Sequence, residues 1–369
     1  MTQAVLDLKE LRVYRGGVQV LDIPSFSLQE NEFLSLIGPN GAGKSTLLLA
    51  IMGLVKRQSG SLHYRGEQVR SDARWLEIRR KMAMVLQEPL LFDTTVYDNV
   101  ASGLRIRGFA RSELRNRVMG YLERFNLADM AQRSARKLSG GEARRVSLAR
   151  AFAVEPELIF FDEPFANLDP PTRQSLTEDM DRIIRENGIA AVLVTHDQSE
   201  ALRMSNRIVV MNDGAIVQSG PPAEVMNRPV NEFVANFVGM ETILEAVVLR
   251  NERQHVTLSV GGQEIDTVGE VAGEEVYCCI RPENVTVSVG TSNGQTSARN
   301  VYRARILDIA SMGPFLKLRL DCGFVLTSYV TRESFAELAL YEGKEVCASF
   351  KATSVHLIPK RASLVQAGI

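Results

Sequence analysis

The stretch Gly38-Pro39-Asn40-Gly41-Ala42-Gly43-Lys44-Ser45-Thr46 decides the fold, because it fits the pattern G-x-x-x-x-G-K-[ST]. The apolar residues 33–37 before it predict a buried strand, and residues 45–52 after it predict a helix. A glycine-rich turn between a strand and a helix is the setting in which this pattern binds phosphate. The sequence therefore predicts a nucleotide site at this turn. A plain glycine-rich turn is the alternative, which the flanking strand and helix disfavour.

The residue types of this turn suit an anion. Glycines let the chain approach phosphate oxygens closely, and the start of the following helix adds N–H groups and partial positive charge. Lys44 is expected to reach the terminal phosphates, and the Ser45 hydroxyl is expected to ligate Mg²⁺. The residues predicted to contact the nucleotide here are Gly38, Asn40, Gly41, Gly43, Lys44, Ser45 and Thr46.

Length and charge exclude several classes of protein. A chain of 369 residues allows two or three domains with cores of their own. A net charge of −1 without a long Lys/Arg block gives no electrostatic footprint for nucleic acid. The apolar stretch 47–55 is too short to span a bilayer, and residues 1–10 lack the apolar core of a secretory signal. We therefore expect a cytosolic chain that binds no nucleic acid.

The pattern of apolar residues changes near residue 220. Before it, strands and helices alternate, which predicts an open, mostly parallel sheet covered by helices. Beyond residue 240, short runs alternate with period two, most clearly at 316–321, where a turn and a partner strand at 324–330 follow. We expect a first domain at 1–236, a linker at 237–243 and a β-rich domain at 244–369. The cysteines of this last part lack metal-ligand spacing and are predicted to be reduced and buried: Cys278, Cys279, Cys322 and Cys347.

Two acids end a second predicted strand. Residues 158–161 form a continuous apolar run, as in a central parallel strand, and Asp162 and Glu163 follow it directly. Ligands gather at such strand ends. Asp162 is expected to hold Mg²⁺ through water, and Glu163 to accept a proton from the water that attacks the γ-phosphate. The alternative is that the two acids only end a strand and cap the next helix.

Two further strands deliver polar side chains to the same edge. His196 follows the buried run 191–194 and is expected to touch the γ-phosphate. Gln87 follows the run 82–86 and is expected to sense the metal ion or the attacking water. Each has a plainer alternative, a structural histidine and an ordinary loop glutamine.

A second helix start also suits an anion. Ser139 and Glu142 have the spacing of a capping box, and Gly140 and Gly141 lie between them. Because the chain has one Lys44 loop, we expect this helix start to serve a nucleotide held by a second copy of the chain. The alternative is a bare helix cap.

Together these elements resemble the ATPase subunits of ATP-binding-cassette (ABC) transporters, in order over residues 1 to about 236. The family has a phosphate loop, a Gln loop (Gln87), an LSGGE signature (138–142), a strand ending in Asp-Glu, a loop containing Asp169 and a switch histidine (His196). The family also stacks adenine on an aromatic side chain, and Tyr14 fits that place unless it is only a strand aromatic. The departures are Asn31-Glu32, where Gly-Glu is usual, and Ala143-Arg144-Arg145 after the signature.

The resemblance implies the fold, the cofactors and the partners. The fold is α/β, a P-loop NTPase of the ABC type with a helical subdomain at about 88–155, followed by an OB-like β-barrel domain. The cofactors are ATP and Mg²⁺. The chain is expected to form a homodimer that docks peripherally on two integral-membrane permease subunits at the cytoplasmic face of the inner membrane. An extracytoplasmic solute-binding protein would supply the solute.

The C-terminal residues reduce the number of candidate solutes. Residues 297–300, 331–343 and 351–355 resemble the molybdate-binding Mop module of the transport-associated OB (TOBE) fold, at about 295–360. Short hydroxyls and cations suit an oxyanion, and they would come from Ser297, Arg299, Lys351 and Thr353 if their two strands adjoin. A purely structural barrel is the alternative.

We therefore expect an ATP-hydrolysing import subunit for molybdate or tungstate. The alternatives are import of sulfate, a sugar or a polyamine, or an ABC ATPase or oxyanion sensor that works without a permease.

Overall fold

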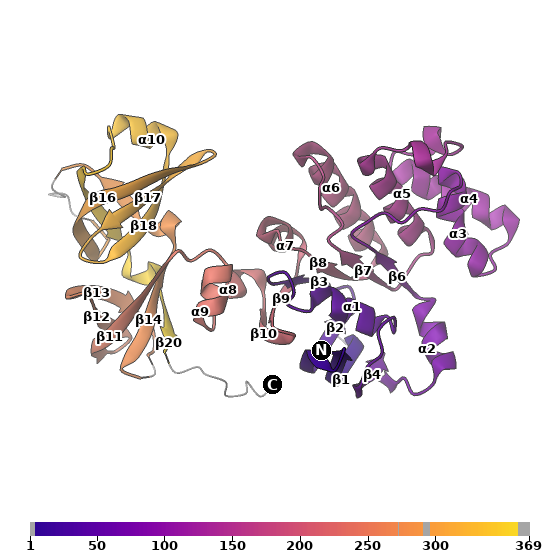
Figure 1. Cartoon of the computed structure of the whole chain (residues 1–369), viewed down its shortest axis with the longest axis horizontal. Helices are drawn as coiled ribbons and strands as arrows, with labels where there is room; N and C mark the ends of the chain where they lie inside the picture. Colours follow the sequence, from indigo (N-terminus) through magenta and orange to yellow (C-terminus); the bar gives the residue numbers. More distant parts are fainter. Residues whose placement is uncertain (1–3, 272, 291–295, 361–369) are drawn as a thin grey trace. The chain divides into compact units, whose positions relative to one another are not determined.

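The computed structural model describes residues 4–271, 273–290 and 296–360, which form two compact units that divide after Pro222 (Figure 1). The sequence placed this boundary at residue 236 instead. The difference lies in α8 (Pro222–Asn227) and α9 (Glu232–Phe237), which belong to the second unit. Within that unit, Arg281 donates a hydrogen bond to the Met226 carbonyl, and His356 Nε2 donates one to the Pro229 carbonyl at 2.8 Å. Residue 295, where the Mop-like segment was expected to begin, lies outside the described residues.

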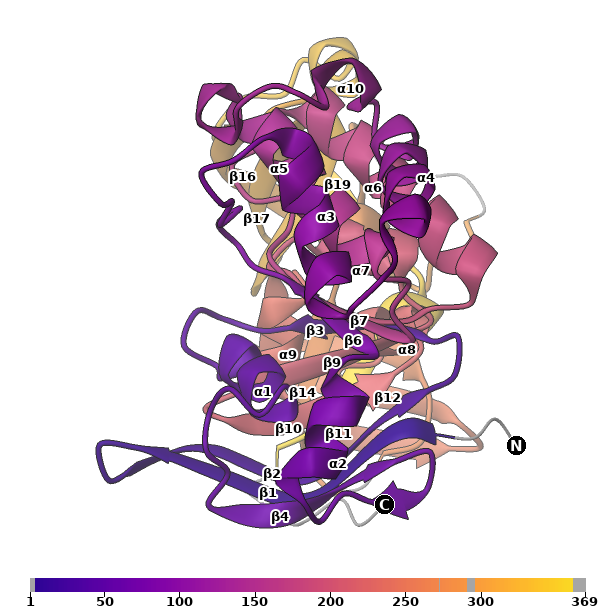
Figure 2. The same cartoon turned by 90° about the vertical axis from the view of Figure 1, so that its right-hand side faces the viewer.

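The first unit is layered. Figures 1 and 2 show an antiparallel sheet, then α1 (Lys44–Ile51), then a mainly parallel sheet, with further helices on the far face of the parallel sheet. The antiparallel sheet has the order β2-β1-β4-β5, with β1 at Ala4–Arg15, β2 at Val18–Gln29, β4 at Ser59–Tyr64 and β5 at Glu67–Gln68. The parallel sheet has the order β10-β9-β3-β8-β7-β6, with β3 at Phe33–Ile37, β6 at Met82–Val85, β7 at Leu158–Asp162, β8 at Ala190–Val194, β9 at Arg207–Asn212 and β10, antiparallel to β9, at Ala215–Gly220.

The remaining helices of this unit follow the alternation expected from the sequence. They are α2 (Asp72–Arg79), α3 (Val96–Ile106), α4 (Arg111–Arg124), α5 (Gly140–Ala153), α6 (Pro170–Asn187) and α7 (Gln198–Met204).

Both faces of the parallel sheet are buried, which explains why β7 is apolar at successive positions. Phe161 packs into a cluster with α3, α4, α5 and α6, whereas its neighbour Phe160 packs into a cluster with α1 and the antiparallel sheet. Both side chains are 0% exposed. Side chains of adjacent residues point to opposite faces of a strand, so a sheet covered on both sides needs continuous apolar runs.

The second unit carries two five-stranded sheets of antiparallel pairs. One has the order β13-β12-β11-β14-β20, with β11 at Thr242–Glu252, β12 at His255–Val260, β13 at Gln263–Val268, β14 at Glu275–Ile280 and β20 at Val355–Pro359. The other has the order β15-β19-β16-β17-β18, with β15 at Thr286–Ser288, β16 at Asn300–Met312, β17 at Phe315–Asp321, β18 at Val325–Thr331 and β19 at Glu345–Phe350; α10 (Arg332–Glu337) follows β18.

Local predictions for this unit are confirmed. The expected hairpin is formed by β17 and β18, in which Leu318 pairs with Ser328, and Leu318 is fully buried while its neighbour Arg319 is exposed. The four cysteines are free and buried. Burial raises the pKa of Cys279 to about 12, which keeps this thiol protonated at neutral pH.

Candidate nucleotide site

The phosphate loop connects β3 to α1 and depends on close backbone approach. Gly38 has a φ of 152°, and a Cβ there would lie 2.2 Å from the Met211 carbonyl oxygen. Gly43 has a φ of 97°, and a Cβ there would lie 2.6 Å from Leu21 Cδ2. A side chain at position 38 would collide with backbone, and one at position 43 would strain the backbone and crowd Leu21, so glycine suits both positions.

Lys44 lies over this loop. Its ammonium group donates hydrogen bonds to the carbonyl oxygens of Gly38 at 2.8 Å and Pro39 at 2.9 Å, and the residue is 6% exposed. Burial lowers the pKa of Lys44, and the negative charges of Glu163 and Asp162 oppose this effect. The loop therefore holds a buried cation in the place where the terminal phosphates are expected.

Ser45 and Asp162 meet although they come from different elements. The Ser45 hydroxyl at the start of α1 donates to Asp162 Oδ1 at the end of β7, over 2.8 Å. Burial raises the pKa of Asp162, and the charge of Glu163 raises it further. A hydroxyl and a carboxylate at one point are ligands that suit Mg²⁺, so the residues present fit this ion.

Glu163 and His196 also lie together at the ends of β7 and β8. His196 Nδ1 lies 3.3 Å from Glu163 Oε2, and the Glu163 N–H donates to the Val194 carbonyl at 3.0 Å. Glu163 adopts a left-handed backbone conformation with φ of 46°. Such a conformation is costly for a glutamate and is often found at functional sites.

Gln87 is exposed just beyond the end of β6. The buried Arg144 of α5 holds this segment, because it donates a hydrogen bond to the Leu86 carbonyl at 2.9 Å. Sequence reasoning assigned no role to Arg144. A second arginine of α5, Arg150, donates to the Leu90 carbonyl at 2.8 Å, and its guanidinium carbon lies 5.8 Å from the centroid of the Phe92 ring. The signature helix is thus joined directly to the segment that follows Gln87. The only sequence signal was the arginines after LSGGE.

The signature helix α5 begins with the expected capping box. The Glu142 N–H donates to Ser139 Oγ at 3.3 Å, and the Ser139 N–H donates to Glu142 Oε2 at 2.7 Å. Ser139 and Gly140 are exposed, whereas the Glu142 carboxylate is occupied by this cap and by Arg133, 3.3 Å away. Asp169 caps α6 by accepting from the Thr172 N–H at 3.0 Å.

Tyr14 lies near the end of β1 and is 42% exposed. Its hydroxyl donates to Gln19 Oε1 at 2.8 Å, across the pair that the two residues form between β1 and β2. This hydrogen bond orients an aromatic ring that is still accessible for stacking.

The residues predicted for the oxyanion lie in the second unit. Asn300 of β16 pairs with Phe350 of β19, so the two strands adjoin as the prediction requires, and Arg299 and Lys351 are the next residues outward. Lys351, Ser297 and Thr353 are exposed. Arg299 Nη1 lies 3.2 Å from His255 Nε2, and since a guanidinium group only donates, Nε2 is the acceptor. His255 was not singled out from the sequence.

Within the part of the chain that the structure describes, no helix is long and apolar enough to cross a bilayer.

Family models match both parts of the chain. Residues 21–166 match the ABC transporter family, and residues 296–357 match the TOBE domain family. The chain is 40% identical over 337 residues to a molybdate/tungstate import ATP-binding protein of Pyrococcus horikoshii, covering 91% of this chain and 94% of the relative. It is 37% identical over 288 residues to a spermidine/putrescine import ATP-binding protein of Desulfitobacterium hafniense, covering 77% and 81%.

Solved structures agree with the family matches. A component of the ABC transporter complex cbiONQ of Clostridium perfringens matches 65% of this chain and 96% of its own, with a TM-score of 0.57 and 27% identity. A dimeric ATP-binding cassette bound to ADP and Pi matches 59% of this chain and 98% of its own, with a TM-score of 0.54 and 30% identity. The chain belongs to the ATP-binding subunits of ABC transporters, and it carries a TOBE domain after its ATPase unit.

Proposed function

We propose that this chain hydrolyses ATP to drive the import of molybdate or tungstate. The observation that carries the proposal is the 40% identity to a molybdate/tungstate import ATP-binding protein, which extends over 91% of the chain. The match to the polyamine importer covers 77% of the chain. Import of a polyamine is therefore the second candidate.

The ATPase step is assigned to residues around the phosphate loop. Lys44 binds the terminal phosphates, and Ser45 and Asp162 would hold Mg²⁺, which neutralises phosphate charge when it is bound. Glu163 accepts the proton of the attacking water, and His196, 3.3 Å from its carboxylate, orients that carboxylate toward the γ-phosphate. Tyr14 stacks on adenine, and Gln87 contacts the metal ion or the attacking water.

A second copy of the chain completes the site. The N-terminus of α5, with Ser139 and Gly140 exposed, provides N–H groups and a hydroxyl for a phosphate group. The Lys44 loop already serves the chain's own nucleotide, so α5 serves the nucleotide of the partner copy. Asp169, at the start of α6, contributes to the same interface. The working form is a homodimer.

A groove beside α5 is the proposed docking surface for the permease. It has a volume of about 420 Å³, and its lining includes Leu90, Phe92, Ile106 and Arg150. Phe92 is 55% and Ile106 78% exposed, so the groove presents large apolar side chains to solvent. An apolar groove of this kind fits a helix of an integral-membrane permease. The chain would then be peripheral, at the cytoplasmic face, with a solute-binding protein on the other side of the membrane.

The TOBE domain is proposed to bind the transported oxyanion through Ser297, Arg299, Lys351 and Thr353. The pairing of Asn300 with Phe350, which places Arg299 and Lys351 just beyond the adjoining ends of β16 and β19, supports this assignment. The competing proposal is a barrel that binds no anion.

The test of the function is solute uptake by vesicles that contain the full chain and its permease. Tungstate or molybdate, delivered by the binding protein, should stimulate both uptake and ATP hydrolysis. Spermidine and sulfate serve as competing solutes in the same assay. Stimulation by spermidine alone would favour the second candidate.

A further inference from the structure

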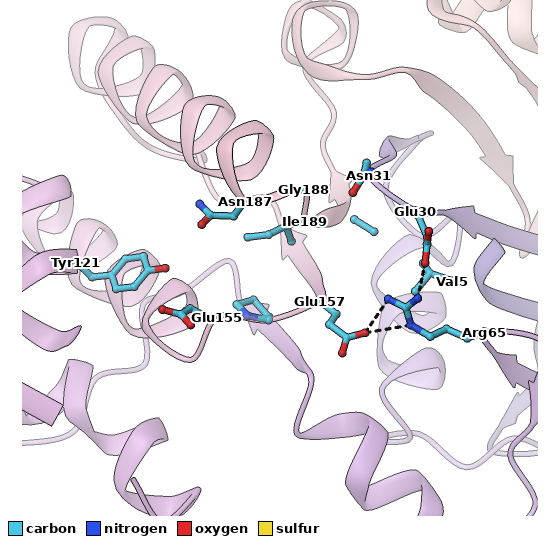
Figure 3. A pocket seen from close by; sticks show the side chains of 12 residues that line it. Val5, Glu30, Asn31, Arg65, Tyr121, Glu155, Glu157, Asn187, Gly188 and Ile189 are labelled. Carbon is cyan, nitrogen blue, oxygen red and sulfur yellow. Dashed lines mark hydrogen bonds and ion pairs between the residues drawn. The ribbon is translucent and has the colours of Figure 1, made fainter. Parts of the chain in front are cut away.

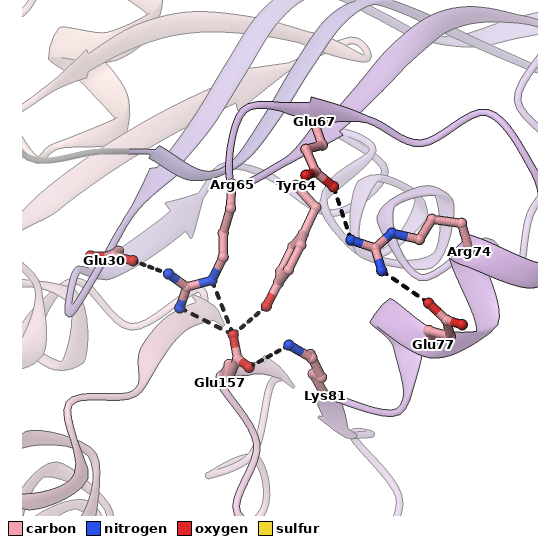
Figure 4. Close-up of polar contacts among 8 residues, drawn as sticks. All are labelled: Glu30, Tyr64, Arg65, Glu67, Arg74, Glu77, Lys81 and Glu157. Atoms are coloured by element: carbon pink, nitrogen blue, oxygen red, sulfur yellow. Dashed lines mark hydrogen bonds and ion pairs between the residues drawn. The ribbon is translucent and has the colours of Figure 1, made fainter.

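Glu157 joins the two sheets of the first unit. It precedes β7 by one residue and accepts hydrogen bonds from two residues at the end of β4, the Tyr64 hydroxyl and the Arg65 guanidinium group (Figure 4). The Arg65 Nη2–Glu157 Oε2 distance is 3.1 Å. On the parallel-sheet side, Lys81 Nζ, just before β6, lies 2.9 Å from Glu157 Oε1.

These hydrogen bonds and ion pairs connect the two sheets in a defined geometry. Tyr64 is only 4% exposed, so its hydroxyl depends on an acceptor within the protein, and Glu157 is that acceptor. Arg65 also forms an ion pair with Glu30, in the turn that enters β3. One side of the antiparallel sheet is thus tied to the amino ends of β3, β6 and β7.

The opposite side of the same two sheets has its own connections. The Asp22 N–H of β2 donates to the Gly214 carbonyl at 2.9 Å, in the turn between β9 and β10. Arg207 of β9 donates to the Ser27 carbonyl of β2 at 2.6 Å. In the sheet orders β2-β1-β4-β5 and β10-β9-β3-β8-β7-β6, the Asp22 and Arg207 contacts and the Tyr64–Glu157 contact lie toward opposite margins, while the Arg65–Glu30 pair lies in the turn after β2.

Apolar packing fills the space between the margins. Leu8 of β1 and Phe160 of β7 belong to the same buried cluster. Apolar contact is non-directional, so it resists separation of the layers more than a small rotation between them. Hydrogen bonds at one margin alone would still allow one sheet to rotate relative to the other. Hydrogen bonds at both margins fix the angle between the two sheets.

We propose that Glu157 is a positioning residue for nucleotide binding, which sets the place of Tyr14 relative to the phosphate loop. Tyr14 lies on β1, which pairs with β4 from Leu6–Tyr64 to Arg12–Ser59. Lys44 begins α1, which follows β3 of the parallel sheet, and Asp162 ends β7 of that sheet. The inference rests on the adenine-stacking role proposed above for Tyr14.

The surroundings of Glu157 determine how strongly its replacement should affect nucleotide binding. A pocket of about 400 Å³ lies beside it, with Glu30, Arg65 and Glu155 in its lining (Figure 3). The side chains of Arg65 and Glu157 are 46% and 34% exposed, so water weakens each ion pair. Replacement of Glu157 by alanine should therefore weaken the connection between the two sheets without creating a buried cavity.

The test compares two ligands on the full chain by calorimetry. A non-hydrolysable ATP analogue needs both Tyr14 and the phosphate loop, whereas inorganic tripolyphosphate needs only the loop. Glu157→Ala should weaken the ATP analogue about fivefold and leave tripolyphosphate unchanged. Tyr14→Ala should show the same selectivity, and the double variant should be no weaker than Tyr14→Ala alone, because Glu157 acts through Tyr14.

A matched control lies on the same sheet. Glu67 forms an ion pair with Arg74 (Figure 4), with an N–O distance of 2.9 Å, but its side chain is 73% exposed and Arg74 belongs to α2, not to the parallel sheet. Glu67→Ala should bind both ligands as the parent does. If Glu157→Ala does not fold, Glu157→Gln keeps an acceptor for Tyr64, loses the charge, and should show a smaller loss with the same selectivity.

The possible outcomes distinguish the positioning role of Glu157 from the adenine-stacking role of Tyr14. Equal weakening of both ligands, or additive effects in the double variant, would mean that Glu157 is only structural. If Tyr14→Ala weakens the ATP analogue and Glu157→Ala does not, the positioning role alone is wrong. If Tyr14→Ala has no effect, the adenine role fails, and the inference fails with it.

Discussion

His196 Nδ1 and Glu163 Oε2 lie 3.3 Å apart, at the ends of the neighbouring strands β8 and β7. The Glu163 side chain is 17% exposed, whereas that of His196 is 63% exposed. The carboxylate is thus held inside the site while the imidazole remains accessible to a ligand. The first prediction tests the role of this carboxylate.

Glu163→Gln should retain ATP binding and lower the hydrolysis rate by roughly 10²-fold or more, the usual scale for loss of a positioned base. Lys44→Ala should lose nucleotide binding instead, because the ammonium group contacts phosphate in the ground state. The measurements are equilibrium binding and steady-state phosphate release. A Glu163→Gln protein with the parent's hydrolysis rate would refute the assignment.

Asp162→Asn should raise the Tm of the nucleotide-free protein and abolish binding of Mg²⁺-ATP. Burial raises the pKa of Asp162, so wherever the carboxylate is ionised its negative charge destabilises the folded protein. The gain in Tm should shrink as the pH falls and the parent carboxylate becomes protonated. Thermal melts of both proteins at several pH values test this, and an equal gain at acidic pH would contradict it.

Ser139→Arg should prevent ATP-dependent dimerisation of a Glu163→Gln protein, because the long side chain would occupy the place of the partner's nucleotide. The change also removes the cap of α5, at a cost of about 1 kcal/mol. Ser71→Arg is the matched control, since Ser71 caps α2 through the Arg74 N–H at 3.2 Å. Light scattering with and without ATP provides the measurement. Dimers of the Ser139→Arg protein would exclude the shared site.

Phe92→Asp should uncouple transport from ATP hydrolysis and leave nucleotide affinity intact, because a charge in the groove opposes docking of an apolar helix. Leu76→Asp is the control: Leu76 is 50% exposed on α2 and does not line the groove. Uptake and hydrolysis are compared in the same reconstituted vesicles. Transport at the parent rate by Phe92→Asp would move the docking surface elsewhere.

Arg299→Ala and Lys351→Ala should each weaken binding of molybdate or tungstate to the full-length dimer, since charge-assisted hydrogen bonds to an oxyanion are stronger than neutral ones. Arg250→Ala, which breaks an exposed ion pair with Glu264 at 3.0 Å, should bind as the parent does. Calorimetry with molybdate, tungstate and sulfate measures the affinities. An absence of heat from the parent protein at millimolar anion would leave a structural barrel.

The elements that sequence reasoning identified are those with a local signal. The phosphate loop has a fixed spacing, β7 is a continuous apolar run, and the hairpin of β17 and β18 alternates with period two. The contacts that it missed join residues far apart in the chain. Tyr64 and Glu157 are separated by 93 positions, and Arg299 and His255 by 44.

The division of the chain into its two compact units also depends on contacts between distant residues. Helices α8 and α9 have ordinary amphipathic sequences, which do not say which core they join. Their place depends on long-range contacts such as that of Arg281 with the Met226 carbonyl. Polar contacts between distant turns leave no periodic pattern in the sequence, so only the folded chain reveals them.

The position of β3 in its sheet has a consequence for biosynthesis. Its residues are buried on both faces, and its two neighbours are β8 and β9, which end at Val194 and Asn212. While the ribosome is still making the intervening segment, β3 has neither partner, and its apolar residues need protection from aggregation. The phosphate loop follows directly after the end of this strand. The strand that carries this loop therefore gains its place in the sheet only after β8 and β9 have been made.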